Sequence, residues 1–392
     1  MSWEYKTLDQ LGEVSRGRSK HRPRNDPSLF GGKYPFIQTA DVKAANFYIT
    51  EYDTTYNEKG LAQSRLWNPG TLCITIAANI ADTGILAMDA CFPDSVMGFL
   101  PYEGIADVRF VKYCFDILQQ NCKKISQGAA QDNLSWEKLS TILFPAPPIE
   151  VQTKIADILS TYDDLIENNQ KQIKLLEEAA QRLYKEWFID LHFPGHETTP
   201  IADGIPTGWT VQSMNDIAEY INGYAFKPTD WGTVGKPIIK IKEMGSGVTA
   251  DTPRNTGENI PEKYNVTAGD ILFSWSATLS AMIWDEEDGL LNQHLFKVIP
   301  GEGISREFVL QSILKTLDEF SNLTTGSTMK HIQRGKLKEV KVNVPSDELM
   351  MLYKNISEPI REQILNVKRQ MILLREARDR LLPKLMNGEI EV

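Results

Sequence analysis

Two stretches of the chain carry apolar residues at the spacing of a long helix. From residue 155 to residue 187 the apolar positions step alternately by four and three, so they share one helical face. Residues 353–385 repeat the pattern with polar interruptions at Ser357 and Arg378, and Pro383 is expected to kink or end the last turn. The pattern predicts two helices of roughly 35 residues, each about 50 Å long. The predicted apolar seam consists of Ile155, Leu159, Ile166, Ile173, Leu176, Leu183, Ile360, Ile364, Val367, Met371, Leu374 and Leu381.

The segment in front of each helix alternates short β-rich runs with turn residues. Residues 34–38 and 69–74 precede the first helix, and residues 236–240 and 268–273 occupy matching places before the second. Short runs bounded by glycine and proline predict strands. We therefore expect an α+β fold, in which two mixed α/β domains are separated by the two long helices.

The chain also contains an internal repeat. Residues 175–183 and 373–381 share the pattern Leu-Leu-x-Glu-Ala-x-x-Arg-Leu at an offset of 198 positions, and the same offset relates Gly128 to Gly326. A repeat of about half the chain predicts two copies of one unit related by a pseudo-twofold axis. The expected boundaries are 1–147 for the first domain, 148–190 for a central helix, 191–206 for a linker, 207–345 for the second domain and 346–388 for a distal helix.

Charge indicates how the two helices pack. Acidic side chains crowd residues 157–167 at the start of the first helix, and basic side chains crowd residues 375–384 at the end of the second. Antiparallel packing sets these groups against each other, whereas parallel packing would place the acids beside further acids in residues 347–362. The sequence therefore predicts an antiparallel coiled coil. The alternative is that each helix packs only on its own domain.

Composition is that of an ordinary globular protein, with 42% hydrophobic and 24% charged residues. No apolar run is long enough to cross a bilayer and no secretory signal opens the chain, so we expect a cytoplasmic location without a membrane partner. All four cysteines fall in the first half and are expected to be reduced, mostly buried thiols. His192 and His196 flank a chain-breaking Phe-Pro-Gly stretch, and no cysteine or histidine pair lies near enough to complete a zinc site, so no metal site is expected.

No motif in the sequence supports catalysis. Residues 146–149 lack the acid or amide and the aromatic residue of an amino-methyltransferase site. Residues 232–237 have the wrong glycine spacing for a phosphate-binding loop, and a proline replaces the hydroxyl residue that would bind magnesium. We expect a non-catalytic chain that binds no cofactor of its own.

Features suited to nucleic acid are present although the net charge is −10. Residues 16–24 and 330–341 are strongly basic, and the polar loops 126–133 and 324–331 recur at one position of both copies. Arginine and lysine neutralise phosphates, and amide and hydroxyl side chains bond base edges. The alternatives are a solvated basic face, an ordinary surface turn and, for Trp275, burial in the core. The candidate DNA-binding residues of the first domain are Arg16, Arg18, Lys20, Arg22, Arg24, Gln38, Thr39, Thr75, Asn79, Gln127, Gln131 and Asn133. Those of the second are Asn222, Tyr224, Lys227, Lys240, Trp275, Ser276, Thr278, Ser327, Thr328, Lys330, His331 and Arg334.

An ordered set of motifs resembles the specificity (S) subunits of type I restriction-modification systems. The motifs are Pro147-Pro148-x-x-x-Gln152, the Leu-Leu-x-Glu-Ala-x-x-Arg-Leu repeat, residues 183–190, and Ile205-Pro206-x-Gly208-Trp209. Together they cover essentially the whole chain. One departure is Met350, which stands where the second copy would repeat Gln152.

The resemblance implies that each half is a target recognition domain for one part of a split sequence in double-stranded DNA. The paired helices would set the spacing and dock two methyltransferase (M) subunits, which methylate adenine with S-adenosylmethionine. Motor-nuclease (R) subunits would use ATP and Mg to cut unmodified DNA. Two other hypotheses remain at this point. The chain could be the recognition half of a fused restriction-methylation enzyme, or a coiled-coil scaffold that binds only protein.

Overall fold

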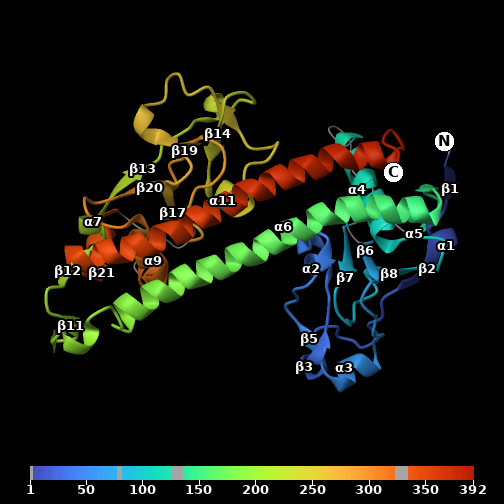
Figure 1. The fold of residues 1–392 in the computed structure, drawn as a ribbon, viewed down its shortest axis with the longest axis horizontal. Coiled ribbons are helices and arrows are strands. Elements are labelled where there is room, and N and C mark those ends of the chain that lie inside the picture. The colour runs from blue at the N-terminus through green and yellow to red at the C-terminus, as the bar shows by residue number, and fades with distance from the viewer. Residues whose placement is uncertain (1–2, 77–81, 126–135, 323–333) are drawn as a thin grey trace. The chain divides into compact units, whose positions relative to one another are not determined.

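The computed structural model describes residues 3–76, 82–125, 136–322 and 334–392. The chain forms two compact units: unit 1 contains Met1–Gln170 and Gln370–Val392, and unit 2 contains Lys171–Arg369. Each unit holds a mixed α/β domain together with portions of two long helices, α6 (Ile149–Tyr184) and α11 (Asp347–Met386) (Figure 1).

The domain of unit 1 is built on a five-stranded sheet in which only the last neighbouring pair is parallel. In spatial order the strands are β2 (Gly12–Arg16), β8 (Val96–Pro101), β6 (Leu72–Thr75), β7 (Thr83–Leu86) and β4 (Tyr48–Ile49). Successive side chains of a strand point to opposite faces. Leu72 and Ile74 accordingly lie in one hydrophobic core, whereas Cys73 lies in a second core around Trp67. Both faces of the sheet are therefore covered.

Shorter elements complete unit 1. Two antiparallel pairs are β1 (Glu4–Lys6) with β9 (Phe144–Ala146) and β3 (Phe30–Pro35) with β5 (Thr55–Tyr56). The helices are α1 (Leu8–Leu11), η1 (Pro27–Leu29), α2 (Thr39–Ala44), α3 (Glu58–Ala62), α4 (Val108–Ile125) and α5 (Trp136–Leu139). The strand expected at residues 34–38 ends at Pro35, because Gln38 caps α2 and its amide donates to Asp41 Oδ2 at 2.6 Å.

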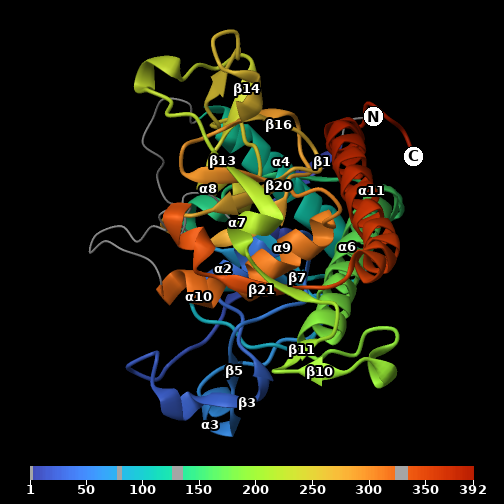
Figure 2. The same ribbon diagram turned by 90° about the vertical axis from the view of Figure 1, so that its left-hand side faces the viewer.

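The domain of unit 2 contains two four-stranded sheets. The first is antiparallel throughout, in the order β13 (Ala218–Asn222), β20 (Leu295–Pro300), β17 (Ile271–Ser274) and β18 (Ser280–Ile283). The second has the order β15 (Arg254–Asn255), β14 (Lys236–Ile239), β19 (Gly289–Leu291) and β16 (Asn265–Val266), with β14 parallel to β19. The first sheet repeats the order β2-β8-β6-β7 of unit 1, as a duplicated fold requires, and its strands β13 and β20 are labelled in Figures 1 and 2.

The remaining elements of unit 2 are short. Two antiparallel pairs are β12 (Thr210–Ser213) with β21 (Lys341–Val344) and β10 (Ile201–Ala202) with β11 (Ile205–Pro206). The helices are η3 (His196–Thr198), α7 (Met214–Ile217), η4 (Pro228–Asp230), α8 (Ile241–Ser246), η5 (Glu262–Tyr264), α9 (Arg306–Lys315), α10 (Leu317–Asn322) and η6 (Arg334–Lys338). The pair β12–β21 corresponds to β1–β9 of unit 1.

The two long helices end in different ways. A π-helical turn, η2 (Lys185–Ile189), comes directly after α6. Helix α11 continues beyond Pro383 to Met386, so Pro383 lies inside its last turn and does not end it. A proline within a helix removes one backbone hydrogen bond. The buried side chains of Leu382, Leu385 and Met386 hold this last turn on the core of unit 1.

The helices run antiparallel within each unit. In unit 1, Asp163 of α6 forms an ion pair with Arg378 near the end of α11. In unit 2, Trp187, just after α6, packs on Tyr353 near the start of α11, with ring centroids 5.9 Å apart. The early part of one helix thus meets the late part of the other in both units. The predicted α+β fold with two mixed domains and an antiparallel helix pair is confirmed.

The predicted seam residues lie on the covered faces of these helices. Seven are buried: Ile155, Leu159, Ile166, Ile173, Ile364, Val367 and Met371. Five are half-buried: Leu176, Leu183, Ile360, Leu374 and Leu381.

Three of the four cysteines, Cys73, Cys91 and Cys114, are buried free thiols, and burial raises the pKa of each.

Candidate nucleic-acid interface

The basic segment of unit 1 is fixed to the sheet at its start. Arg16 is the last residue of β2, and the amides of Gly17 and Arg18 donate to the carbonyl oxygens of Val96 and Phe92 at 2.9 and 3.0 Å. A Cβ at residue 17 would stand 2.4 Å from the Phe92 oxygen, so only glycine allows this close approach. The segment therefore leaves the sheet at a defined position.

The cations of this segment divide into two groups. Arg22 Nη1 donates to the carbonyl oxygens of Ser19 and His21 at 2.7 and 2.8 Å, and Arg24 forms an ion pair with Asp94 at 2.7 Å. These two guanidinium groups hold the loop itself. Arg16, Arg18 and Lys20 are exposed, and within the described residues no ion pair engages them. These three are the cations available for phosphate.

A carboxylate keeps the loop folded. Asp26 accepts from the Ser28 amide at 2.9 Å and lies 2.7 Å from His21 Nε2. The Ser28 amide and hydroxyl, together with His21, lower the pKa of Asp26 from 3.8 to about 2.

Arg65 belongs to the same surface although no sequence pattern pointed to it. Its guanidinium stacks 3.8 Å from the Trp67 ring centroid and donates to Ser15 Oγ at 3.0 Å, beside Arg16 on β2. It also pairs with Glu13 at 3.4 Å. The only sequence signal was an isolated arginine close to a tryptophan.

The other candidate residues of the first domain differ in exposure and in their hydrogen-bond partners. Gln38 is exposed and its amide donates to Thr54 Oγ1 at 3.3 Å, and Thr39 is half-buried. Thr75 is 1% exposed, and its hydroxyl accepts the Asp82 amide at 2.9 Å. Its side chain serves the strand end, so the expectation of a DNA contact there is corrected. Asn79, Gln127, Gln131 and Asn133 lie outside the described residues.

In unit 2 several candidates lie at one edge of the first sheet, where β13 and β17 end and β20 begins. Asn222 ends β13 and is exposed, and the residue after β17 is Trp275. His294, just before β20, lies 6.1 Å from the Trp275 ring and its Nδ1 is 3.3 Å from Ser276 Oγ. Gln293 and His294 were missed from sequence, since their partners are distant along the chain.

The same cluster extends through Tyr224. Its carbonyl oxygen accepts the Gln293 amide at 2.9 Å, and its ring packs on Phe226 and Tyr264 at 4.9 and 5.4 Å. Trp275 is half-buried and also packs on Phe296 at 5.8 Å, so most of its ring serves the core. Ser276 is buried, whereas Thr278 is exposed.

Two lysines flank this domain's second sheet. Lys227 is exposed before η4. Lys240 caps α8, with its Nζ 5.6 Å from the ring of Trp231 and 3.9 Å from Glu243. Trp231, 49% exposed, is a second aromatic that sequence reasoning missed.

The last candidates of the second domain fall at or beyond a gap in the described ranges. Ser327, Thr328, Lys330 and His331 lie outside the described residues. Arg334 begins η6, and its side chain is outside the described set.

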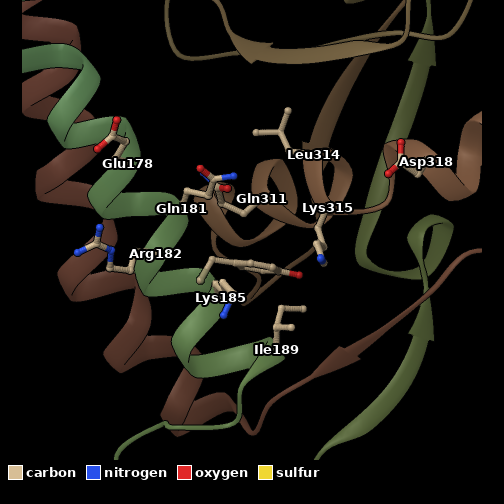
Figure 3. A pocket seen from close by; sticks show the side chains of 10 residues that line it. Glu178, Gln181, Arg182, Lys185, Ile189, Gln311, Leu314, Lys315 and Asp318 are labelled. Carbon is tan, nitrogen blue, oxygen red and sulfur yellow. The ribbon is translucent and has the colours of Figure 1, made fainter. Parts of the chain in front are cut away.

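Unit 2 also contains a polar groove of about 580 Å³ beside α6 (Figure 3). Arg182 and Lys185 of the α6 end and η2 line one side, and Gln311 and Lys315 of α9 line the other. Lys185 pairs with Asp190, which raises the pKa of the lysine. The groove is lined largely by polar and charged groups, as expected of a hydrated surface.

Metal-binding clusters and membrane-spanning helices are both absent from the described residues. No group of three His, Cys, Asp or Glu side chains there is arranged to hold a metal ion. No helix of the described ranges combines the length and the apolar character that crossing a bilayer requires.

Comparison with known proteins gives a consistent result. Residues 1–178 and 206–349 match the family described as the type I restriction modification DNA specificity domain. The MjaIX specificity subunit of Methanocaldococcus jannaschii is 25% identical, covering 100% of this chain and 94% of its own length. The HindI specificity subunit of Haemophilus influenzae is 23% identical, covering 97% and 98%.

A solved structure shares the fold. The type I restriction-modification S subunit from M. genitalium superposes with a TM-score of 0.59 at 15% identity, covering 98% of this chain and 96% of its own. The family match falls separately on the two domain-bearing halves, and the family resemblance predicted from the motifs is confirmed. The chain belongs to the type I restriction-modification DNA-specificity family and is a specificity subunit, not a catalytic one.

Proposed function

We propose that each domain reads one half of a bipartite target in double-stranded DNA. The observation that carries this proposal is the double family match, once in each domain-bearing half, combined with different side chains at equivalent strand ends. In unit 1 these ends carry Arg16 and Arg18, and in unit 2 they carry Asn222 and the Trp275–His294 cluster. Two sites of unlike chemistry recognise two unlike half-sites.

The available groups suit the two parts of DNA recognition. Exposed Arg16, Arg18 and Lys20 would contact phosphates or, as bidentate donors, guanine edges. Asn222 offers the amide that pairs with adenine, and Lys227 a further cation. Phosphate contacts fix the position of a protein on the duplex, and base contacts give it sequence preference.

The long helices would set the distance between half-sites and dock two methyltransferase (M) subunits. Motor-nuclease (R) subunits would join the complex on DNA inside the cytoplasm. In this assembly S-adenosylmethionine, ATP and Mg would be bound by the partners, and this chain would hold none of them. Its contribution is recognition and geometry.

Selection of random DNA duplexes by the chain with its M subunits tests the proposal. We expect enrichment of two short sequences separated by a fixed unspecified spacer. The double substitution Arg18→Ala with Lys20→Ala should weaken or relax one half-site only, and Asn222→Ala with Lys227→Ala the other. Lys43→Ala, an exposed lysine in the last turn of α2, is the control. Absence of a bipartite motif, or equal damage to both half-sites from either double substitution, would contradict the proposal.

A further inference from the structure

A buried carboxylate joins three helices in unit 1. Asp163 of α6 is 3% exposed, and it accepts from the hydroxyl of Tyr113 on α4 at 2.5 Å. Its other oxygen accepts from Arg378 of α11. Burial raises the pKa of this carboxyl group, and the charge of Arg378 opposes that shift. The α6 charge is therefore tied to a guanidinium supplied by the other half of the chain.

Unit 2 contains a buried ion pair of its own. Arg361 of α11 is 6% exposed and Glu307 of α9 is 1% exposed. Arg361 donates from Nε and Nη2 to the two Glu307 oxygens at 2.9 and 3.0 Å. Gln311 donates to the same carboxylate at 2.8 Å.

The repeat shows that these pairs have opposite polarity. At the offset of 198 positions, Asp163 corresponds to Arg361 and Glu307 corresponds to Arg109. Arg109 pairs with Asp157 of α6 at 2.8 Å. The long helix therefore presents acid to its domain helix in unit 1 and base to its domain helix in unit 2.

The facing position on the other long helix differs as well. Arg378, the partner of Asp163, corresponds to Ala180 in the first copy. Ala180 is 1% exposed and lies seven residues before Trp187, which packs on Tyr353. Because the helices are antiparallel, seven residues back along α6 correspond to seven residues forward from Tyr353 along α11. That position lies in the turn that carries Arg361. Ala180 thus lies opposite Arg361, where a second cation would be repelled.

We propose that these oppositely charged buried groups make pairing between the two halves heterotypic, so that each half accepts the other and rejects a second copy of itself. Pairing α11 with another α11 in the same register would set Arg378 against Arg361. Pairing α6 with another α6 would leave Asp163 opposite Ala180, without its guanidinium. An uncompensated buried charge is strongly unfavourable, whereas a paired one is tolerated.

Heterotypic pairing rests on the fold and not on DNA reading, so it can fail while the proposed function stands. Its consequence for that function is direct. Such pairing favours the helix pair within one chain over exchange of like helices between two chains, so the two different recognition domains of one chain serve a single asymmetric target.

Substitutions in the full-length chain test the polarity. The urea midpoint of unfolding should be highest with the natural Arg378, lower for Arg378→Met and lowest for Arg378→Glu. A glutamate at this position would face the carboxylate of Asp163. At position 180 the order should reverse: Ala180→Glu should keep a higher midpoint than Ala180→Arg, with Ala180→Met as the control for added volume. The same order of preference at both positions would overturn the proposal.

A second chain tests the rejection of like halves. It joins residues 1–206 to a further copy of residues 1–190, so that two first halves must pair. We expect a lower urea midpoint than that of the natural chain, and a rise when Ala180→Arg is introduced in both copies but not with Ala180→Met. A midpoint equal to that of the natural chain, or no difference between the arginine and methionine variants, would refute heterotypic pairing.

Discussion

At the scale of residues, engagement within the loop separates arginines that look alike in sequence. Arg24 is bonded to Asp94 and Arg22 to backbone carbonyls, whereas no ion pair within the described residues engages Arg18 or Lys20. Only side chains without a protein partner can exchange water and counterions for phosphate without first breaking a bond to the protein. The protein partners of each side chain therefore distinguish the residues of a basic run.

This difference predicts distinct salt dependences. Arg18→Ala and Lys20→Ala should each reduce the slope of log K against log salt by about 0.9, the counterion release of one phosphate contact. Arg24→Ala should leave the slope nearly unchanged, because Arg24 is committed to Asp94. Binding of the assembled complex to its target at several salt concentrations measures all three. A slope change for Arg24→Ala as large as that for Arg18→Ala would show that Arg24 leaves Asp94 for DNA.

Asp26 gives the same loop a pH dependence. Its pKa of about 2 in the folded chain lies below the ordinary 3.8, so the folded loop favours the carboxylate. The contribution is fully present above pH 3.8 and is lost as the pH falls toward 2. The protection of the Ser28 amide, its exchange rate relative to the intrinsic rate at each pH, should fall across this range, and Asp26→Asn should abolish the dependence. A protection factor that stays constant down to pH 2 would rule out this role.

Some features of the candidate interface follow from the sequence and others do not, for physical reasons. The exposed cations of residues 16–20 were accessible because charge density is local in sequence. Thr75 was misassigned because its hydroxyl is engaged by the backbone amide of Asp82, a contact that the sequence pattern does not reveal. His294 was missed because its contact with Trp275 exists only once β17 and β20 pair. Residues are predictable where their partners are near in sequence.

At the scale of elements, Gln152 shows how α6 is attached to its domain. Its side chain is 1% exposed, donates to the carbonyl oxygens of Ile105 and Pro147 at 3.0 and 2.9 Å, and accepts the Asp107 amide at 3.2 Å. The equivalent Met350 is also buried, and its side chain carries no amide to donate or accept hydrogen bonds. The glutamine therefore satisfies backbone groups at the entry to the helix.

Gln152→Met should consequently destabilise the chain, because it leaves those backbone groups buried without a partner. Each buried unsatisfied group costs about 1–3 kcal/mol. Urea unfolding should show this loss, while Gln170→Met on the same helix should have little effect, since the Gln170 amide meets only Asn46 at the surface. Equal effects of the two substitutions would mean that the bonds of Gln152 contribute nothing beyond packing.

Elements were predictable in proportion to their length. The two heptad stretches gave the long helices because a period sustained over many turns leaves no competing structure. Their ends were less accessible: α11 passes Pro383 because tertiary contacts of Leu385 and Met386 outweigh one lost hydrogen bond. Short strands shifted for a similar reason, as when the cap at Gln38 stopped β3 at Pro35.

At the scale of the whole molecule, the physical units differ from the sequence repeats. Each repeat is a continuous half of the chain, but unit 1 takes residues 370–392 from the far end, and unit 2 takes residues 171–206 from the first half. The duplicated sequence is thus built into units that exchange their helix ends. The long helices join the units, and their length should enter the spacing of the DNA target.

Deleting four residues from the middle of α6 and four from the middle of α11 tests this coupling. The change removes about 6 Å of helix and rotates the remainder of each helix by about 40°. One base pair contributes about 3.4 Å and roughly 35°. The rotation of about 40° therefore corresponds to the loss of one base pair, whereas the shortening of about 6 Å corresponds to the loss of nearly two. Because each further base pair turns a half-site about 35° away from its domain, we expect the spacer to shorten by one, read from methylated sites in genomic DNA.

Deleting two residues from each helix is the matched control. It shortens the helices by only about 3 Å but rotates the remainder of each helix by about 200°, so the apolar seam no longer faces its partner. This variant should lose bipartite recognition altogether, although it changes length less. An unchanged spacer in the four-residue variant, or retained recognition in the two-residue variant, would show that the helices do not measure the target. Rotation, more than length, then decides which spacers a helical ruler of this kind accepts.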